Sequence, residues 1–240
     1  MKQFEDAIEL VEHSKLVLKK IEHAYDQSLY EKEIKTTLLI EIKNFMENLR
    51  SAFDYTARGI FEKYGNSSNP APHIYFPYAW KTLTKADFRD KRIVEKAIPG
   101  INSSRPDIVT RIESYQHFEN PKNNWLPIFM ELTNENKHQQ LTPQEKKEKK
   151  KLKLSSNGRT MTLSGKMSIS KGHQMKMGNM IIPGGQTFDA SNPPSFTGEG
   201  TAGIVTWISF HFSTNNQPVL PFLKLCIAGT VAIINDLISV

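Results

Sequence analysis

The stretch Leu152–Leu163, LKLSSNGRTMTL, decides the fold class of this chain of 240 residues. Apolar and polar residues alternate on both sides of Asn157-Gly158, and Asn-Gly between two alternating runs is a strong signal for a β-hairpin turn. Upstream of this stretch, apolar residues recur at helical spacing instead. The change from a period of 3.6 residues to a period of two predicts an α+β protein.

The upstream half is predicted to be helical. Apolar residues between Phe4 and Tyr25 recur at helical spacing, with charges opposite, and predict a first helix. Ser28 and Glu31 have the spacing of a capping box, which predicts that a long second helix begins there and runs through Tyr64. Shorter helices are expected to begin at the motif Thr84-x-x-Asp87, and to run from Ser104 to about Asn120 and from about Asn124 to Gln140. Residues 72–78 are expected to be extended.

The segment that leads into the hairpin begins with a second strong helix signal. Thr142, Pro143 and Glu145 occupy the N-cap, first and third positions of a potential helix, which predicts a short lysine-rich helix. Beyond the hairpin, alternation predicts short strands at residues 166–170, 175–182 and 204–212, and an apolar run predicts a helix over residues 219–239.

These elements predict a chain of three parts. Residues 1–145 form an antiparallel helical body, residues 146–216 form a lysine-rich connector with a small antiparallel β insertion, and residues 217–240 form a C-terminal helix that packs on the body.

Composition excludes several classes of protein. Cys226 is the only cysteine, so neither a disulfide framework nor a cysteine-based zinc site is expected. The N-terminus has no apolar signal region, and Lys224 and Asp236 interrupt the apolar tail, whose uncharged core is shorter than the about 20 residues of a spanning helix. We therefore expect a cytoplasmic protein without membrane, metal or cofactor.

The net charge of +6 is concentrated in one run. A local charge of +5, from six lysines and one glutamate, leaves about +1 for everything else. Two interpretations stay open, namely a solvated connector and an arm that contacts the phosphates of a nucleic acid. The arm would consist of Lys146, Lys147, Lys149, Lys150, Lys151 and Lys153.

Two polar clusters form the candidate catalytic site. On a helical wheel of residues 44–64, Arg50 and Asp54 lie at the rim of the apolar face, Glu47 continues their stripe and Tyr55 lies opposite the core. The alternative is a ladder of charges that only stabilises a surface helix.

The second cluster lies at the end of the helix predicted from residue 124. There Asn136 and Lys137 fall on the apolar side, and Asn134 and His138 share its flank. A lysine on a buried face needs a partner, so we predict that Arg50 and Asp54 lie near Lys137 and His138 in a cleft. Together these groups could bind a phosphodiester and move protons, with Glu47, Tyr55, Asn134 and Asn136 around them. The alternative is a polar cap that ends the helix.

The runs Leu49–Tyr55 (LRSAFDY), Phe76–Tyr78 (FPY) and Asn136–His138 (NKH) resemble a group of uncharacterised bacterial proteins with the pattern L-R-S-A-L-D-H, F-P-I and D-K-H-R. The Arg-x4-His of that group is similar to the signature of the HEPN superfamily. The resemblance implies a helical, HEPN-like body, a homodimer, and metal-independent ribonuclease activity in bacterial defence or stress response. Tyr55 stands at the histidine position, which leaves His138 as the candidate for that role.

Two functions are expected from these features. The first is a protein that binds or cleaves RNA, with Arg50 stabilising phosphate charge and with His138 or Lys137 handling protons. The alternative is a non-catalytic subunit that binds a protein partner, because Tyr55 replaces the reactive histidine and cannot exchange a proton near neutral pH as histidine does.

Overall fold

The computed structural model describes residues 1–31, 33–66, 73–138, 141 and 143–240, without the side chains of residues 29–31, 136–138 and 207. The chain forms two compact units. One, called the helical unit here, comprises Met1–Glu145 and His211–Val240. The other, the β unit, comprises Lys146–Phe210. The protein is therefore α+β, with a small antiparallel sheet and a C-terminal helix, as its periodicity predicted.

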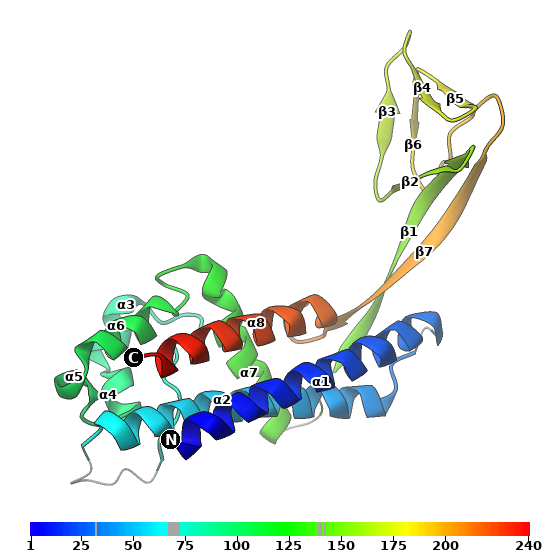
Figure 1. Cartoon of the computed structure of the whole chain (residues 1–240). Helices are drawn as coiled ribbons and strands as arrows, with labels where there is room; N and C mark the ends of the chain where they lie inside the picture. The colour runs from blue at the N-terminus through cyan, green and yellow to red at the C-terminus, as the bar shows by residue number, and fades with distance from the viewer. Residues whose placement is uncertain (32, 67–72, 139–140, 142) are drawn as a thin grey trace. The chain divides into compact units, whose positions relative to one another are not determined.

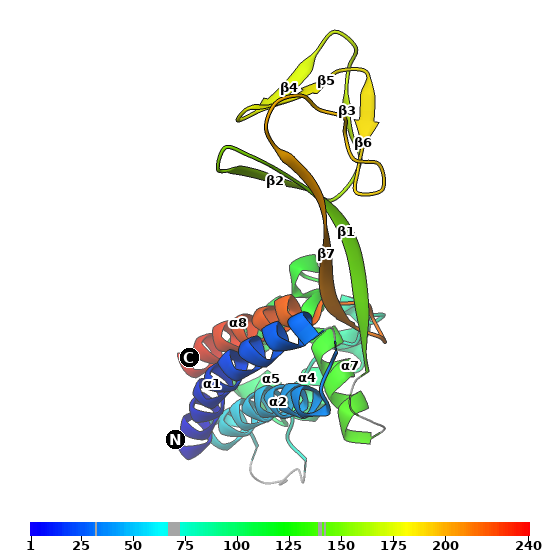
Figure 2. The same ribbon diagram turned by 90° about the vertical axis from the view of Figure 1, so that its right-hand side faces the viewer.

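The helical unit is built on four long helices (Figures 1 and 2). These are α1 Lys2–Glu31, α2 Thr36–Tyr64, α7 Trp125–His138 and α8 Val219–Ile238. Helices α1, α2 and α8 pack against one another, and α7 contacts α2 and α8. Between α2 and α7 the chain forms short helices, which are α3 Lys85–Asp90, α4 Ile93–Ala97, α5 Ile101–Ser104, α6 Pro106–Ser114 and the 3-10 helix η1 Pro121–Asn124.

The start of α3 was predicted correctly, because Thr84 and Asp87 form a reciprocal capping box. The capping box predicted at Ser28 is wrong. Ser28 is buried inside α1, and α2 begins at Thr36 after Lys35, which makes no side-chain cap. Packing of the apolar face of α1 extends that helix through a local signal for the start of a new helix. The helix predicted from Ser104 is also shorter, because α6 ends at Ser114.

Helix α8 is the apolar C-terminal helix predicted for residues 219–239. Among the described residues it is the one helix long and apolar enough to cross a membrane, by length and composition alone. Of its most apolar window, 44% is buried inside the structure. Its buried side chains include Phe222, Leu223 and Ile234, which belong to the core of the helical unit.

The β unit contains short strands, of which β1 and β7 also extend into the helical unit. Their bounds are β1 Gln144–Ser156, β2 Arg159–Leu163, β3 Met167–Ile169, β4 Gln174–Met177, β5 Met180–Pro183, β6 Gln186–Phe188 and β7 Thr201–Phe212. In the described part of the chain they form sheets with the strand orders β2-β1-β7, β3-β6 and β4-β5. The core of the unit is formed by Leu152, Leu154, Met180, Ile182, Phe188 and Ala190.

The predicted hairpin is confirmed. Ser156 pairs with Arg159, so Asn157 and Gly158 form a two-residue turn, with φ angles of 47° and 73°. Positive φ at both central residues is the geometry of a type I′ turn, which matches the twist of the strands.

The lysine-rich helix predicted from Thr142 is wrong. Thr142 lies outside the described residues, and from Gln144 to Ser156 the chain is a strand. Leu152 and Leu154 are buried on one face of β1, and β1 pairs with both β2 and β7. Long-range strand pairing therefore overrides the local capping signal. The strand predicted over residues 175–182 is instead the hairpin of β4 and β5, which turns at Gly178 with a φ of 59°.

Candidate functional site

Arg50 and Asp54 lie one turn apart on α2 and pair with each other. The Arg50 Nε is 3.3 Å from an Asp54 carboxylate oxygen, and their side chains are 12% and 31% exposed. The low exposure places the guanidinium at the border of the core, as the helical wheel indicated. Because the Arg50 side chain is largely buried, water screens this pair less than it screens a fully exposed ladder of charges.

The two side chains also contact other elements. The second Asp54 carboxylate oxygen accepts a hydrogen bond of 2.9 Å from the backbone N–H of Phe76. The Arg50 guanidinium lies 5.2 Å from the centroid of the Tyr78 ring, and its Nη1 contacts the Met130 sulfur on α7. Arg50 and Asp54 therefore connect α2 to the extended segment 73–80 and to α7.

A second side chain holds the same extended segment. Gln116 is fully buried, and its Oε1 accepts a hydrogen bond of 2.8 Å from the backbone N–H of Ala79. Its Nε2 donates to the carbonyl of Ile112 at 2.8 Å, which fixes the orientation of the amide. The Phe76 ring packs on Phe53 of α2 at a centroid distance of 4.6 Å. Segment 73–80 is thus anchored from α2 and through Gln116, in spite of having no regular secondary structure.

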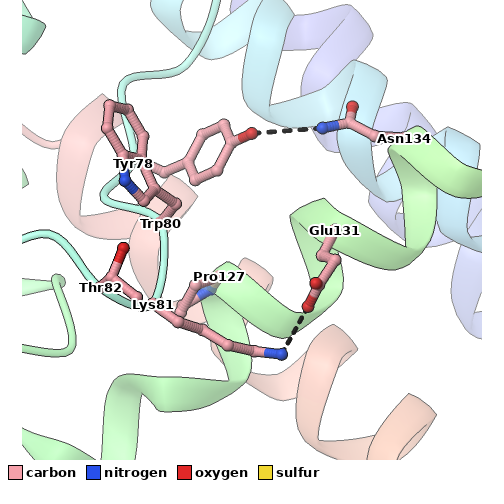
Figure 3. Close-up of a pocket in the computed structure, with 7 residues that line it drawn as sticks. All are labelled: Tyr78, Trp80, Lys81, Thr82, Pro127, Glu131 and Asn134. Atoms are coloured by element: carbon pink, nitrogen blue, oxygen red, sulfur yellow. Dashed lines mark hydrogen bonds and ion pairs between the residues drawn. The ribbon is translucent and has the colours of Figure 1, made fainter. Parts of the chain in front are cut away.

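A cleft, called the aromatic cleft here, opens beside this segment (Figure 3). It has a volume of about 410 Å³ and is lined by Tyr78, Trp80, Lys81, Thr82, Pro127, Glu131 and Asn134. The Asn134 amide donates a hydrogen bond of 3.3 Å to the Tyr78 hydroxyl, and Lys81 pairs with Glu131 at 2.5 Å. The first contact joins segment 73–80 to α7 and the second joins the adjacent Lys81 to α7, as the dashed lines in Figure 3 indicate.

The predicted site residues differ in the contacts that they make. Tyr78 connects two of them, because its ring meets the Arg50 guanidinium and its hydroxyl meets Asn134. Glu47 pairs instead with Lys43 on its own helix at 3.2 Å. Tyr55 is 44% exposed.

The remaining predicted residues lie at the end of α7. The backbone of Asn136, Lys137 and His138 forms the last turn of α7, and their side chains lie outside the described part of the structure. Their proximity to Arg50 and Asp54 stays a prediction.

Sequence reasoning missed Trp80 and Gln116 as members of this region. Trp80 follows the aromatic, proline-flanked stretch 72–78, so the density of aromatic residues was a usable signal. Nothing in the sequence pointed to Gln116, because its role depends on a backbone N–H that lies 37 residues away along the chain.

The predicted phosphate-contacting lysines lie on β1. Alternation along a strand puts Lys147, Lys149, Lys151 and Lys153 on one face, opposite the face that buries Leu152. Of these four, Lys149 and Lys153 are exposed. On the other face Lys146 pairs with Glu148 at 3.0 Å.

Charge is divided unequally between the two units. The β unit contains ten lysines and arginines and three acidic residues, a formal charge of +7. The helical unit contains 21 basic and 22 acidic residues, a charge of −1. The basicity of the chain is therefore a property of its β unit.

Comparison of the chain with protein-family models, with curated proteins and with solved structures finds no match. Among the described residues, no group of three or more histidine, cysteine, aspartate or glutamate side chains could hold a metal ion.

Proposed function

We propose that this protein binds RNA through its β unit, and that the lysine face of β1 contacts the phosphates. The observation that carries the proposal is the segregation of charge, with +7 on 65 residues and −1 on the other 175. A basic surface of this kind attracts polyanions and gains affinity from the release of counterions.

The strand geometry of β1 supports the same proposal. A helix would distribute six lysines around its circumference, whereas a strand places every second side chain on one face. Residues two apart on a strand are about 7 Å apart. Lys147, Lys149, Lys151 and Lys153 therefore form a row of positive charge along one face. Lysine on a strand also discourages pairing with other sheets. The salt dependence of RNA binding by lysine variants separates that role from phosphate binding.

We propose that the protein binds RNA without cleaving it, and that Arg50 and Asp54 are not catalytic. Asp54 accepts a hydrogen bond from the backbone N–H of Phe76 while it pairs with Arg50. Arg50 also contacts Tyr78 and Met130. These contacts support a structural role for the pair. The HEPN-like relationship of the helical unit is part of this proposal and rests on the motifs from Leu49 to Tyr55 and from Phe76 to Tyr78.

The binding experiment compares two triple variants with equal changes of charge. Lys149→Ala/Lys151→Ala/Lys153→Ala removes lysines from the row on β1, whereas Lys166→Ala/Lys171→Ala/Lys176→Ala removes lysines elsewhere in the β unit. Affinity for a fluorescein-labelled single-stranded RNA is measured by anisotropy between 50 and 300 mM salt. We expect the first variant to lower the slope of log K against log salt by about 2, because each phosphate contact to a single strand contributes about 0.7.

The control triple should change that slope by less than half as much. Equal effects of the two triples would reject the β1 row as the binding face. Absence of salt-dependent RNA binding by the unmodified protein would reject the proposed function.

Cleavage is tested separately by incubating total RNA with the protein and a chelator. Intact RNA is the expected result. Cleavage by the unmodified protein that is lost in both Arg50→Ala and His138→Ala would establish a metal-independent ribonuclease and overturn the non-catalytic assignment.

A further inference from the structure

We propose that the aromatic cleft of the helical unit binds an adenine base, which stacks on Trp80 and is read by the Asn134 amide. This site is separate from the lysine row, and the inference does not depend on RNA binding by the β unit. The shared chemistry of its ligands is adenine, either in a free nucleotide or in an unpaired position of RNA.

The first observation is the exposure of Trp80. Its side chain is 46% exposed, although tryptophan is among the residues that gain most from burial. Single exposed aromatic residues are common and need no explanation. Trp80 differs because it lines, together with Tyr78, the aromatic cleft of about 410 Å³. Pockets of about 300–1,000 Å³ hold small organic ligands.

The second observation is the rigidity of the segment that carries both rings. The backbone N–H groups of Phe76 and Ala79 are held by Asp54 and Gln116, and Tyr78 is held by Arg50 and Asn134. Aromatic side chains that are held in place before binding lose little conformational entropy when a ligand binds. Stacking on such side chains is open to any base, because every base has a π-face.

The polar groups of the cleft supply the selectivity. Asn134 is exposed, and a side-chain amide presents a donor and an acceptor, the pattern that matches N6 and N7 of adenine. Its hydrogen bond to the Tyr78 hydroxyl orients the amide at the cleft. Thr82 adds a hydroxyl that can donate or accept.

Two lysines lie at or near the aromatic cleft, one in its lining and one against the Trp80 ring. The Lys91 Nζ is 5.2 Å from the centroid of the Trp80 ring, and Lys81 reaches across the cleft to Glu131. A stacked base beside lysine ammonium groups is the combination found in single-strand binding sites. The cleft therefore favours an anionic nucleotide over an uncharged aromatic ligand.

The test is calorimetric titration of the full-length Lys149→Ala/Lys151→Ala/Lys153→Ala variant, which lacks three of the four lysines of the β1 row. The probes are AMP, UMP, oligo(A) and oligo(U). We expect adenine probes to bind more tightly than uracil probes. Trp80→Ala should weaken binding on the order of tenfold or more, and Trp80→Phe should recover part of it. Asn134→Ala should reduce the ratio of AMP to UMP affinity.

The matched control is Tyr75→Ala, which removes another exposed aromatic side chain from the same segment without altering the cleft lining. It should bind AMP as the parent does. Binding of AMP would identify a free nucleotide as a ligand, and binding of oligo(A) alone would identify an unpaired base in RNA. Absence of binding by every probe, or equal affinity in Trp80→Ala and the parent, would overturn the inference. Because three of the four lysines of the row are absent in these proteins, and because the proposed RNA binding of the β unit is tested by the salt dependence of the lysine variants, either result leaves that proposal to its own test.

Discussion

Asp54 accepts a hydrogen bond of 2.9 Å from the backbone N–H of Phe76, across 22 residues of sequence. This contact gives the Arg50–Asp54 pair a role that its spacing on one helix does not reveal. The pair holds an irregular segment against the core and thereby places Tyr78 and Trp80 beside the aromatic cleft. Each end of the segment can be released separately, which makes the contribution of each anchor measurable.

Asp54→Ala should destabilise the protein by about 1–3 kcal/mol, because it leaves the Phe76 N–H without its partner in a partly buried place. Asp54→Asn retains an acceptor and should cost less. Urea denaturation followed by circular dichroism measures the free energy of unfolding. The control is Glu62→Ala, which breaks the exposed Arg58–Glu62 pair of the same helix and should cost about 0.5 kcal/mol or less. A loss in Asp54→Ala no larger than in this control would contradict the anchoring role.

Gln116→Leu removes the other anchor while keeping a side chain of similar size. The Ala79 N–H then loses its acceptor in a buried environment, and we expect a loss of about 1–3 kcal/mol. Combined with Asp54→Ala, the loss should differ from the sum of the two single losses, because both anchors order one segment. Strict additivity in the double variant would indicate that the anchors act independently.

Local signals in the sequence predicted helices and strands correctly where the local conformational preference agrees with the long-range packing of the chain. The alternation around Asn157-Gly158 fixed a hairpin because both the turn and the strands favour it. Thr84 and Asp87 predicted a helix start for the same reason. At Ser28 and Thr142 equally good capping signals failed. Packing of α1 prevailed over the first, and pairing of β1 with β2 and β7 prevailed over the second.

A helical wheel predicts only which face of its own helix a residue lies on, and the candidate site was predictable to that extent. The wheel put Arg50 at the rim of the buried face, and its side chain is 12% exposed. The wheel could not identify the partners of Arg50 and Asp54, since Phe76, Tyr78 and Met130 are distant in sequence. Such contacts are set by the tertiary fold rather than by helix periodicity.

Gly229→Ala should destabilise the helical unit although alanine is the better helix former by about 1 kcal/mol. A Cβ at this position of α8 would overlap the indole of Trp125 on α7. Overpacking of this kind typically costs about 1–3 kcal/mol. Thermal unfolding should show the loss, and the same substitution in a Trp125→Leu background should cost less. An equal cost in both backgrounds would assign the effect to something other than this contact.

Gly158→Ala tests backbone strain in the β unit without steric overlap. Gly158 has a φ of 73°, and no atom lies within 4 Å of a Cβ placed there. The left-handed conformation costs a residue with a Cβ about 1–2 kcal/mol, so faster amide exchange is expected in β1 and β2. Gly165→Ala is the matched control, since Gly165 has equally open surroundings and no positive φ. Similar exchange in the two variants would contradict a strained turn.

The contact between α6 and α8 should weaken in acid through Asp236. The Tyr115 hydroxyl donates to the Asp236 carboxylate, and Arg111 lies 2.5 Å from its other oxygen. The hydrogen bond from Tyr115, followed by Arg111, lowers the pKa of Asp236, whereas burial opposes the change.

A carboxyl whose pKa is lower in the folded state stabilises that state above its unfolded pKa of about 3.9, and the stabilisation is lost as pH falls through the folded value. Asp236→Asn should therefore unfold more easily than the unmodified protein at pH 7, and the difference should shrink below about pH 4. Because the Asp236 side chain is 41% exposed, solvent screening keeps the ionic part of the difference within about 1 kcal/mol. Urea unfolding at pH 7, 5, 4 and 3 measures it, with Tyr115→Phe as the variant that removes the larger cause and keeps the Arg111 pair. A difference between Asp236→Asn and the parent that stays constant from pH 7 to pH 3 would show that the ionised carboxylate contributes nothing to this contact.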